Sequence, residues 1–431
     1  MFELNTNIII DSEIKTFVFK LEKEEIKYNI FDHSLNLLNS TSLPDKGVKL
    51  YSVYIDLDNI IHLVALLSAG ELNYYKYIDE QWSKGTIANF DLKANIYNQI
   101  KIFTVKNKLH LIYNYSNLIN SHIWTLQHVI YDKANGEKHN IIRYISKRAP
   151  DPFFVDIDRL GTIHLFYKTD LSTISQIHHT FYNPYTNNWI SSPKQISSEG
   201  INNLDFYLFI DSYNNLHGLL LEELNNRCKI KYLRMSSKGK EKYIWKEISL
   251  PYILISNYPP IIFQEDNNLK LLYLSDNKIK YITSTDYGIT WSIENIIDSL
   301  DDNHSIVEVS SNLLSKKHKI NHSYFSNPDN PKLNSLNIFS NTTFSLEEIS
   351  SEVINEEIKL EILEEVDIAP NILNDLNNKM DQLILNYETY ESFISIMISN
   401  QVDLENILNN IQISLDKNNQ SFLSKVFKSS K

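Results

Sequence analysis

The chain has 431 residues, of which 42% are hydrophobic and 12% aromatic, so it can bury a large β domain and still carry an additional segment. Its single cysteine, Cys228, excludes an intrachain disulfide and therefore a disulfide-stapled secreted module. The net charge is −12, but residues 345–370 alone hold nine acidic residues against one lysine. Residues 1–344 are nearly neutral, which argues against DNA or RNA as the main partner.

The first residues, MFELNTNIII, have no basic segment ahead of their short apolar run, and no stretch of the chain approaches 18 apolar residues. We therefore expect neither an ordinary secretory signal nor a membrane-spanning segment. A cytoplasmic location is the default expectation, with surface location by non-classical export as the alternative.

One pattern returns along residues 1 to about 345: an Asp- and Asn-rich turn leads into an apolar strand that opens with His or Lys. The five clear copies place these opening residues at spacings of 48, 54, 53 and 53, and they are His62, His110, His164, His217 and Lys270. The same interval reaches Lys15 toward the start and His318 toward the end. Seven copies are therefore expected.

Each copy is predicted to contain four strands, the fourth often opened by tryptophan, as at Trp82, Trp189, Trp245 and Trp291. Four short strands at a period of about 50 residues are typical of a propeller blade. We predict an all-β, seven-bladed β-propeller over residues 1–345, with six blades as the alternative because the first and last copies are weak. Only 9 glycines occur, so Asn and Asp must occupy many tight turns.

The stretch STDYGITW, residues 284–291, lies between the predicted third and fourth strands of the sixth copy. Its spacing of Ser284, Asp286, Gly288 and Trp291 resembles the Asp box of the sialidase-like β-propellers, where this motif occupies the same turn. We expect the Asp286 carboxylate to accept bonds from turn amides, Gly288 to take a conformation costly for other residues, and the Trp291 ring to pack while its N–H finds a partner. The resemblance therefore concerns fold, and these residues are interpreted as structural.

Membership of an active sialidase would imply three arginines from separate blades, a Tyr–Glu nucleophile pair and an acidic acid/base residue. In that family the three arginines bind the substrate carboxylate, and the first of them lies near the N-terminus. This chain has only five arginines, and none precedes Arg143. Lysine is a poor substitute because bidentate carboxylate binding needs the guanidinium fork. We therefore predict no sialidase activity.

Other glycosidases need two carboxylates on opposite sides of a sugar. The candidates near strand ends also sit beside predicted hairpins, where Asp is favoured for local hydrogen bonding, and are Asp56, Asp156, Asp205 and Asp211. The repeated histidines open the second strand of separate blades, too far apart to share one ion, so we expect them to bond within their own blades. No catalytic residue, metal site or cofactor is predicted.

Residues 346–370 are interpreted as an acidic linker, either helical or an extra strand. From residue 371 to 431 no glycine or proline interrupts a heptad pattern, which predicts a long helix or coiled coil. The proposed oligomerisation seam consists of Leu373, Leu376, Met380, Leu383, Ile394, Met397, Leu404, Leu408 and Ile411. The alternative is a helix that packs on its own propeller.

These features together favour a non-enzymatic interaction protein. Its propeller would present a face of loops to a protein or glycan partner, and its C-terminal helix would join copies and raise avidity. The alternatives are a carbohydrate-active enzyme of the sialidase-like superfamily and a multivalent lectin.

Overall fold

The computed structural model describes residues 2–325 except 133–134, 148, 172–173, 225–226, 240–241, 254, 256–257, 276–277, 298–304 and 314–317. The chain divides into two units, Met1–Glu347 and Glu348–Lys431, and all described residues belong to the first. The predicted linker, 346–370, and the predicted helix, 371–431, lie outside the described residues.

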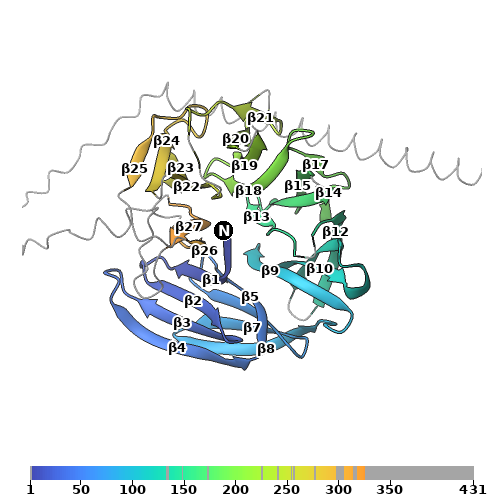
Figure 1. Ribbon diagram of the computed structural model, residues 1–431. Helices are drawn as coiled ribbons and strands as arrows, with labels where there is room; N and C mark the ends of the chain where they lie inside the picture. The colour runs from blue at the N-terminus through green and yellow to red at the C-terminus, as the bar shows by residue number, and fades with distance from the viewer. Residues whose placement is uncertain are drawn as a thin grey trace, which may run out of the picture. The chain divides into compact units, whose positions relative to one another are not determined.

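The described residues form six antiparallel blades arranged in a ring (Figure 1). The first blade contains β1 (Phe2–Ile10), β2 (Thr16–Glu22), β3 (Glu25–Phe31) and β4 (Leu37–Lys46). The second contains β5 (Val48–Ile55), β6 (Ile61–Leu67), β7 (Glu71–Ile78) and β8 (Gln81–Asn89). The third contains β9 (Asn95–Val105), β10 (Lys108–Asn117), β11 (Ile123–Asp132) and β12 (Asn135–Ile145), with a short 3-10 helix, η1 (Leu118–Asn120), between β10 and β11.

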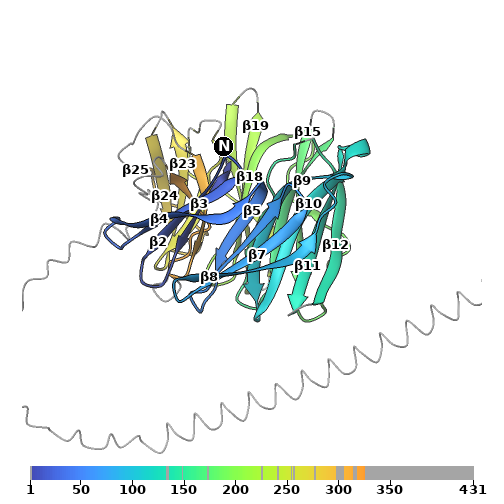
Figure 2. The same ribbon diagram turned by 90° about the horizontal axis from the view of Figure 1, so that it is seen from below.

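The fourth blade contains β13 (Phe154–Ile157), β14 (Ile163–Leu171), β15 (Ile174–Asn183) and β16 (Asn188–Trp189), and β17 (Lys194–Gln195) also pairs with β15. The fifth contains β18 (Asn202–Ile210), β19 (Leu216–Leu224), β20 (Arg227–Met235) and β21 (Trp245–Ile248). The sixth contains β22 (Ile261–Glu265), β23 (Asn268–Ser275), β24 (Lys278–Ser284) and β25 (Asn295–Ile297). In the second to sixth blades the first strand lies nearest the ring axis, and the blades stand side by side in the edge view (Figures 1 and 2).

The all-β propeller is therefore confirmed, but the prediction of seven blades is wrong and the six-bladed alternative is correct. The seventh copy supplies only β26 (Ser305–Ser311) and β27 (His322–Phe325). β26 pairs in parallel with β1, so these two strands extend the first blade at its inner edge. His318, expected to open a strand, lies between β26 and β27.

Side chains of this last hairpin explain why it joins the centre of the ring. Glu308 on β26 forms an ion pair with Lys101 of the third blade. Lys319 donates to Asp156 Oδ1 of the fourth blade and to the carbonyl of Ile210 in the fifth, each at 2.8 Å. Ion pairs in this enclosed region are costly unless their hydrogen bonds are complete, so the partners in three blades hold the hairpin in place.

His322 on β27 completes this central contact. Its ring packs edge-on against Phe154 of the fourth blade and Tyr207 of the fifth, with centroid distances of 5.4 and 5.3 Å. The final strands thus close the ring by filling its centre.

Asn and Asp hold six of the fourteen left-handed non-glycine positions among the described residues, so the prediction from the scarcity of glycine is confirmed in part. Their φ angles lie between 55° and 63° at Asn59, Asn107, Asn187, Asn214 and Asp266. These residues tolerate the left-handed region better than other residues with a Cβ, which lets the hairpins close without glycine. Among the described residues there is no helix of the length and apolar character needed to cross a membrane.

Candidate functional site

Aspartates close turns between strands in five of the six blades. In five of these turns one Oδ1 atom accepts hydrogen bonds from the backbone amides two and four residues later, and the aspartates are Asp11, Asp32, Asp56, Asp158 and Asp211. This is the Asx-type bonding that favours Asp at turns. Asp286 of the sixth blade closes a related turn, with its bonds shifted to the amides three and four residues later.

The STDYGITW turn is closed by its own side chains. The Ser284 hydroxyl donates to Asp286 Oδ1 at 2.8 Å and accepts the amide of Gly288 at 2.8 Å. Asp286 also accepts the Thr290 hydroxyl at 2.6 Å. Burial acts to raise the pKa of the Asp286 carboxyl, but the bonds from Thr290, Ser284 and Ile289 outweigh it and lower this pKa. The carboxylate is thus ionised and engaged within its turn.

Gly288 and Trp291 connect this turn to the fifth blade. Gly288 has a φ of +83°, and a Cβ at this position would lie 1.9 Å from the Tyr232 hydroxyl. The Trp291 ring meets Tyr232 edge-on at a centroid distance of 5.3 Å. The Trp291 Nε1 atom is buried without a hydrogen-bond partner among the described residues, so the prediction that this N–H is bonded is wrong. The ring contact alone carries the interaction.

The repeated histidines bond within their own blades, as expected. His62 bonds the Tyr74 hydroxyl at 2.7 Å and Asp56 at 2.9 Å. His217 likewise bonds the Tyr232 hydroxyl at 2.7 Å and Asp211 at 3.1 Å. Each histidine therefore links the hairpin aspartate to the third strand of its blade.

In the third and fourth blades the partner on the third strand is a second histidine. His110 Nδ1 lies 2.9 Å from His128 Nε2, and His164 Nδ1 lies 3.1 Å from His179 Nε2. The second histidine of each pair then accepts a tryptophan N–H of the next blade, Trp189 onto His128 and Trp245 onto His179, each at 3.1 Å. These chains of hydrogen bonds join neighbouring blades.

Burial favours the neutral form of His110, His128 and His179. It lowers the pKa of His110 to about 4 and holds the pKa of His128 and His179 well below the ordinary value. Neutral rings can accept the indole protons. Within the described residues no group of three or more His, Cys, Asp or Glu side chains is arranged to hold a metal ion.

The four candidate carboxylates separate into two kinds. Asp56 and Asp211 are hairpin residues, as interpreted from the sequence. Asp156 and Asp205 are not: Asp156 lies on β13 and bonds Lys319 and the amide of Ile210, while in that blade the turn is closed by Asp158. The interpretation of Asp156 as a turn residue is therefore wrong. Its carboxylate instead binds Lys319, between β26 and β27.

Asp205 lies on β18 and its Oδ1 accepts the amide of Phe206 at 2.9 Å. Burial raises the pKa of this carboxyl to about 7, and the nearby charge of Asp151 adds to the increase. Asp151 itself pairs with Lys168 at 2.7 Å. The position of Asp205 on a strand shows that the hairpin interpretation is wrong here too.

One of the groups that an active sialidase would need is a Tyr–Glu pair. Tyr273 donates to Glu294 in the sixth blade, which is a Tyr–Glu pair, but the tyrosine is fully buried. Burial raises the pKa of Tyr273 well above its usual value, and the Glu294 charge raises it further, the opposite of what a nucleophile needs. Among the arginines with described side chains, Arg234 donates its Nε to the Tyr287 carbonyl at 2.7 Å.

Arg234 belongs to a surface that the sequence reasoning missed. Three contacting turns of the fifth and sixth blades carry four exposed apolar side chains and the half-buried Tyr287, which together we call the aromatic turn surface: Tyr213, Tyr243, Ile244, Tyr287 and Ile289. Tyr213 and Tyr287 are in ring contact at 4.2 Å. Tyr213, Tyr243 and Ile289 are 46%, 62% and 54% exposed.

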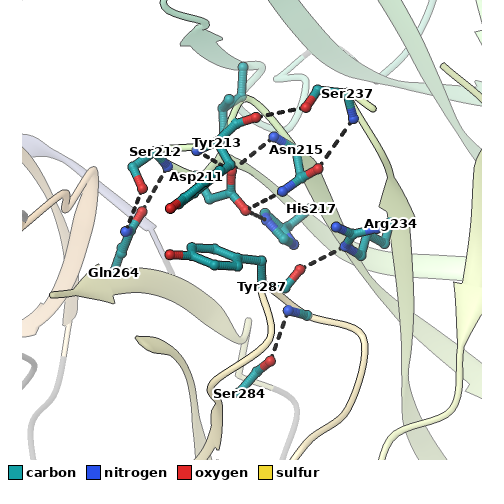
Figure 3. A network of polar contacts seen from close by, with 12 residues as sticks. Asp211, Ser212, Tyr213, Asn215, His217, Arg234, Ser237, Gln264, Ser284 and Tyr287 are labelled. Atoms are coloured by element: carbon teal, nitrogen blue, oxygen red, sulfur yellow. Dashed lines mark hydrogen bonds and ion pairs between the residues drawn. The ribbon is translucent and has the colours of Figure 1, made fainter. Parts of the chain in front are cut away.

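Hydrogen bonds, some partly buried and one exposed, hold the Tyr213 turn in place (Figure 3). Asp211 fixes the amide of Tyr213, and Ser237 donates its hydroxyl to the Tyr213 carbonyl at 2.7 Å. Ser212 exchanges two bonds with Gln264 of the sixth blade, at 2.8 and 2.7 Å. Rigid support beneath exposed aromatic rings suits recognition, because little conformational freedom is lost on binding. The sequence signal was the stretch RMSSKGKEKYIWK, residues 234–246, which combines five cationic and two aromatic residues.

No protein-family model and no curated protein sequence matches the chain. Solved propellers are similar to it at low identity. One is the Dos1 propeller, at 10% identity and a TM-score of 0.42 over 68% of this chain and 70% of that one. The SapL1 lectin in complex with alpha methyl fucoside has 10% identity and a TM-score of 0.40 over 68% and 96%. The Penicillium chrysogenum alpha-L-arabinanase complexed with arabinobiose has 9% identity and a TM-score of 0.42 over 66% and 95%.

Proposed function

We propose that this chain is a non-enzymatic β-propeller interaction protein that presents its turns to a protein or glycan partner. The observation that carries the proposal is the aromatic turn surface, where Tyr213, Tyr243 and Ile289 are each about half exposed or more. Apolar side chains gathered on contacting turns, with a polar rim, are typical of binding surfaces. Binding loops on a rigid scaffold are also the usual location of recognition.

The polar residues that recur along the chain support binding over catalysis. The histidines bond aspartates, tyrosines and other histidines inside the blades. The hairpin aspartates accept backbone amides, and Asp156 holds the last hairpin. Their hydrogen-bonding capacity is therefore used to stabilise the ring.

Self-association is the second part of the proposal. The heptad pattern of residues 371–431 places leucine, isoleucine and methionine along one seam, and burying that seam against identical copies would remove it from water. Several linked propellers would bind a repetitive partner with an avidity far above that of one copy.

A carbohydrate-active enzyme is the second candidate, and Asp205 is the observation that favours it. A carboxyl with a pKa of about 7 can serve as a general acid near neutral pH. The neighbouring Asp151 would supply the second carboxylate, although its charge is committed to Lys168.

Parallel screens of the full-length protein separate these functions. We expect binding on a glycan array or a peptide display library, and no hydrolysis of fluorogenic glycosides. Turnover that Asp205→Asn abolishes, with unchanged unfolding, would establish the enzyme instead. Binding that is unchanged in Tyr213→Ser would move the binding site away from the aromatic turn surface.

Sedimentation tests the oligomer. The full-length protein should sediment as a dimer or trimer, and Leu383→Asp with Leu404→Asp should shift it toward monomer because charge in a packed seam is costly. A monomeric parent protein would contradict self-association and leave the proposed binding surface unaffected.

A further inference from the structure

The aromatic turn surface includes two residues of a basic stretch in an acidic protein. Residues 234–246 contain five cationic residues and one acidic residue, whereas the whole chain has a net charge of −12. Lys238 lies over the Tyr213 ring at 5.5 Å, and Lys242 lies over the Tyr243 ring at 5.6 Å. The two carboxylates beneath, Asp211 and Asp286, are committed to their own turns. Among the described residues, Lys238 and Lys242 therefore place positive charge beside these rings.

The guanidinium of Arg234 is held in place by a hydrogen bond. Its Nε donates to the Tyr287 carbonyl, and the two residues beside it on β20, Leu233 and Met235, are buried. Its remaining guanidinium N–H groups have no hydrogen-bond partner among the described residues. A guanidinium held at one edge and free at the other can form paired hydrogen bonds with a carboxylate, at little further entropic cost.

The apolar members of the surface favour a polypeptide over a saccharide. Ile244 and Ile289 are both about half exposed, and aliphatic side chains contribute to binding chiefly by burying other apolar groups. A sugar could stack on a tyrosine ring, but Lys238 and Tyr287 already lie against Tyr213. Tyrosine and arginine beside aliphatic residues are the composition of energetically dominant residues in protein interfaces.

We propose that the aromatic turn surface binds an acidic polypeptide segment in which carboxylates lie beside apolar side chains. A carboxylate of the partner pairs with Arg234, Lys238 and Lys242 provide further attraction, and the apolar side chains cover Tyr243, Ile244 and Ile289. This inference rests on the proposed binding function and names the partner's chemistry.

Selection from a random peptide display library against the full-length protein tests it directly. The enriched peptides should be rich in Asp and Glu next to aliphatic or aromatic residues. An enriched peptide, made synthetically, should bind about tenfold or more weakly to Lys238→Glu with Lys242→Glu, because two exposed attractions become repulsions. Binding to the parent protein should also weaken as salt increases.

Matched variants separate a local effect from general charge. Lys93→Glu with Lys138→Glu makes the same change in net charge at two exposed positions, one just before β9 and one on β12 of the third blade. This variant should keep its affinity within about twofold of the parent's. Arg234→Lys keeps the charge but removes the fork, and should weaken binding. Thermal unfolding of each variant shows whether its fold is intact.

The other outcomes are each decisive. Enrichment of neutral or basic peptides, or equal binding by the double lysine variant and the parent, would overturn the acidic-peptide inference. Glycan-array hits that need Tyr213 and Arg234, without peptide enrichment, would also overturn it and retain the proposed binding function. Silence on both arrays would remove the proposed function as well.

Discussion

The fourth and fifth blades build the same contact to the next blade from different side chains. Between the fourth and fifth blades, Trp245 of the fifth meets His179 of the fourth edge-on at 5.3 Å and 87°, and its Nε1 donates to His179. Between the fifth and sixth blades, Trp291 of the sixth meets Tyr232 of the fifth at 5.3 Å and 89°, and its Nε1 has no partner among the described residues. The ring geometry is the same, while the hydrogen bond is present in only one.

This difference indicates which interaction the fold requires. An edge-on aromatic contact depends on ring shape and quadrupole and accepts either imidazole or phenol. The hydrogen bond requires an acceptor aimed at the indole, and the Tyr232 hydroxyl, which bonds His217, is not bonded by Trp291 Nε1. Packing between blades is therefore common to both, and the contact between the fifth and sixth blades leaves the buried Trp291 N–H unsatisfied.

Removing the ring should have the largest effect. Trp291→Ala is expected to lower the free energy of unfolding by about 3–5 kcal/mol, as loss of a packed aromatic does. Urea denaturation followed by far-UV circular dichroism measures this. A variant as stable as the parent would show that the Trp291 contact with Tyr232 contributes nothing to the fold.

Crowding the same contact from the other side should cost somewhat less. Gly288→Ala places a Cβ 1.9 Å from the Tyr232 hydroxyl in a residue with positive φ, and should destabilise by about 2–4 kcal/mol. Gly239→Ala is the matched control, since φ is +86° there but no atom lies within 4 Å of the added Cβ. We expect it to cost about 1 kcal/mol, and equal losses would refute the close contact.

Deleting only the indole N–H tests the contrast between the blades. Trp245→Phe leaves His179 Nδ1 without its donor, whereas Trp291→Phe removes an N–H that has no partner. The first should therefore cost about 1–2 kcal/mol more than the second. If the two replacements cost the same in chemical denaturation, the hydrogen bond in the fourth blade carries no net stability.

The smallest expected effect is a difference in acid sensitivity. Burial holds the pKa of His179 well below 6.5 in the folded protein, with the neighbouring His164 and Lys194 adding to the decrease. The unfolded chain therefore binds this proton first as pH falls, so the stabilisation is complete above pH 6.5 and is lost progressively below it.

His179→Tyr gives the fourth blade the residue type of the fifth and removes this titration. Between pH 6.5 and 5.5 the variant should lose about 1 kcal/mol less stability than the parent. The slope of unfolding free energy against pH is the readout, because it is separate from any constant cost of the larger side chain. Parallel slopes would show that His179 is not titrating in this range.

The pattern of the chain was sufficient to predict the blades but not their number. The turn-and-strand repeat that opens at His62, His110 and His164 is local, because each hairpin is closed by its own aspartate or asparagine. The copy at His318 has a similar pattern, yet its strands join β1. Whether a repeat forms a separate blade depends on which edge it pairs with, and that partner is 300 residues away in the sequence.

The sequence by itself determined the all-β repeat, the turn positions and the residues of the Ser284–Trp291 turn, because these follow from periodicity and hydrogen bonds within a few residues. Tertiary structure alone decided the roles of Asp156 and Asp205, which differ from the hairpin aspartates through Lys319 and Asp151, groups distant in the sequence. It also decided the aromatic turn surface, since Tyr213 and Tyr287 meet only when the fifth and sixth blades pack together. Local hydrogen bonds depend on residues that are close in the sequence, whereas a binding surface depends on packing between distant segments, which no short sequence pattern specifies.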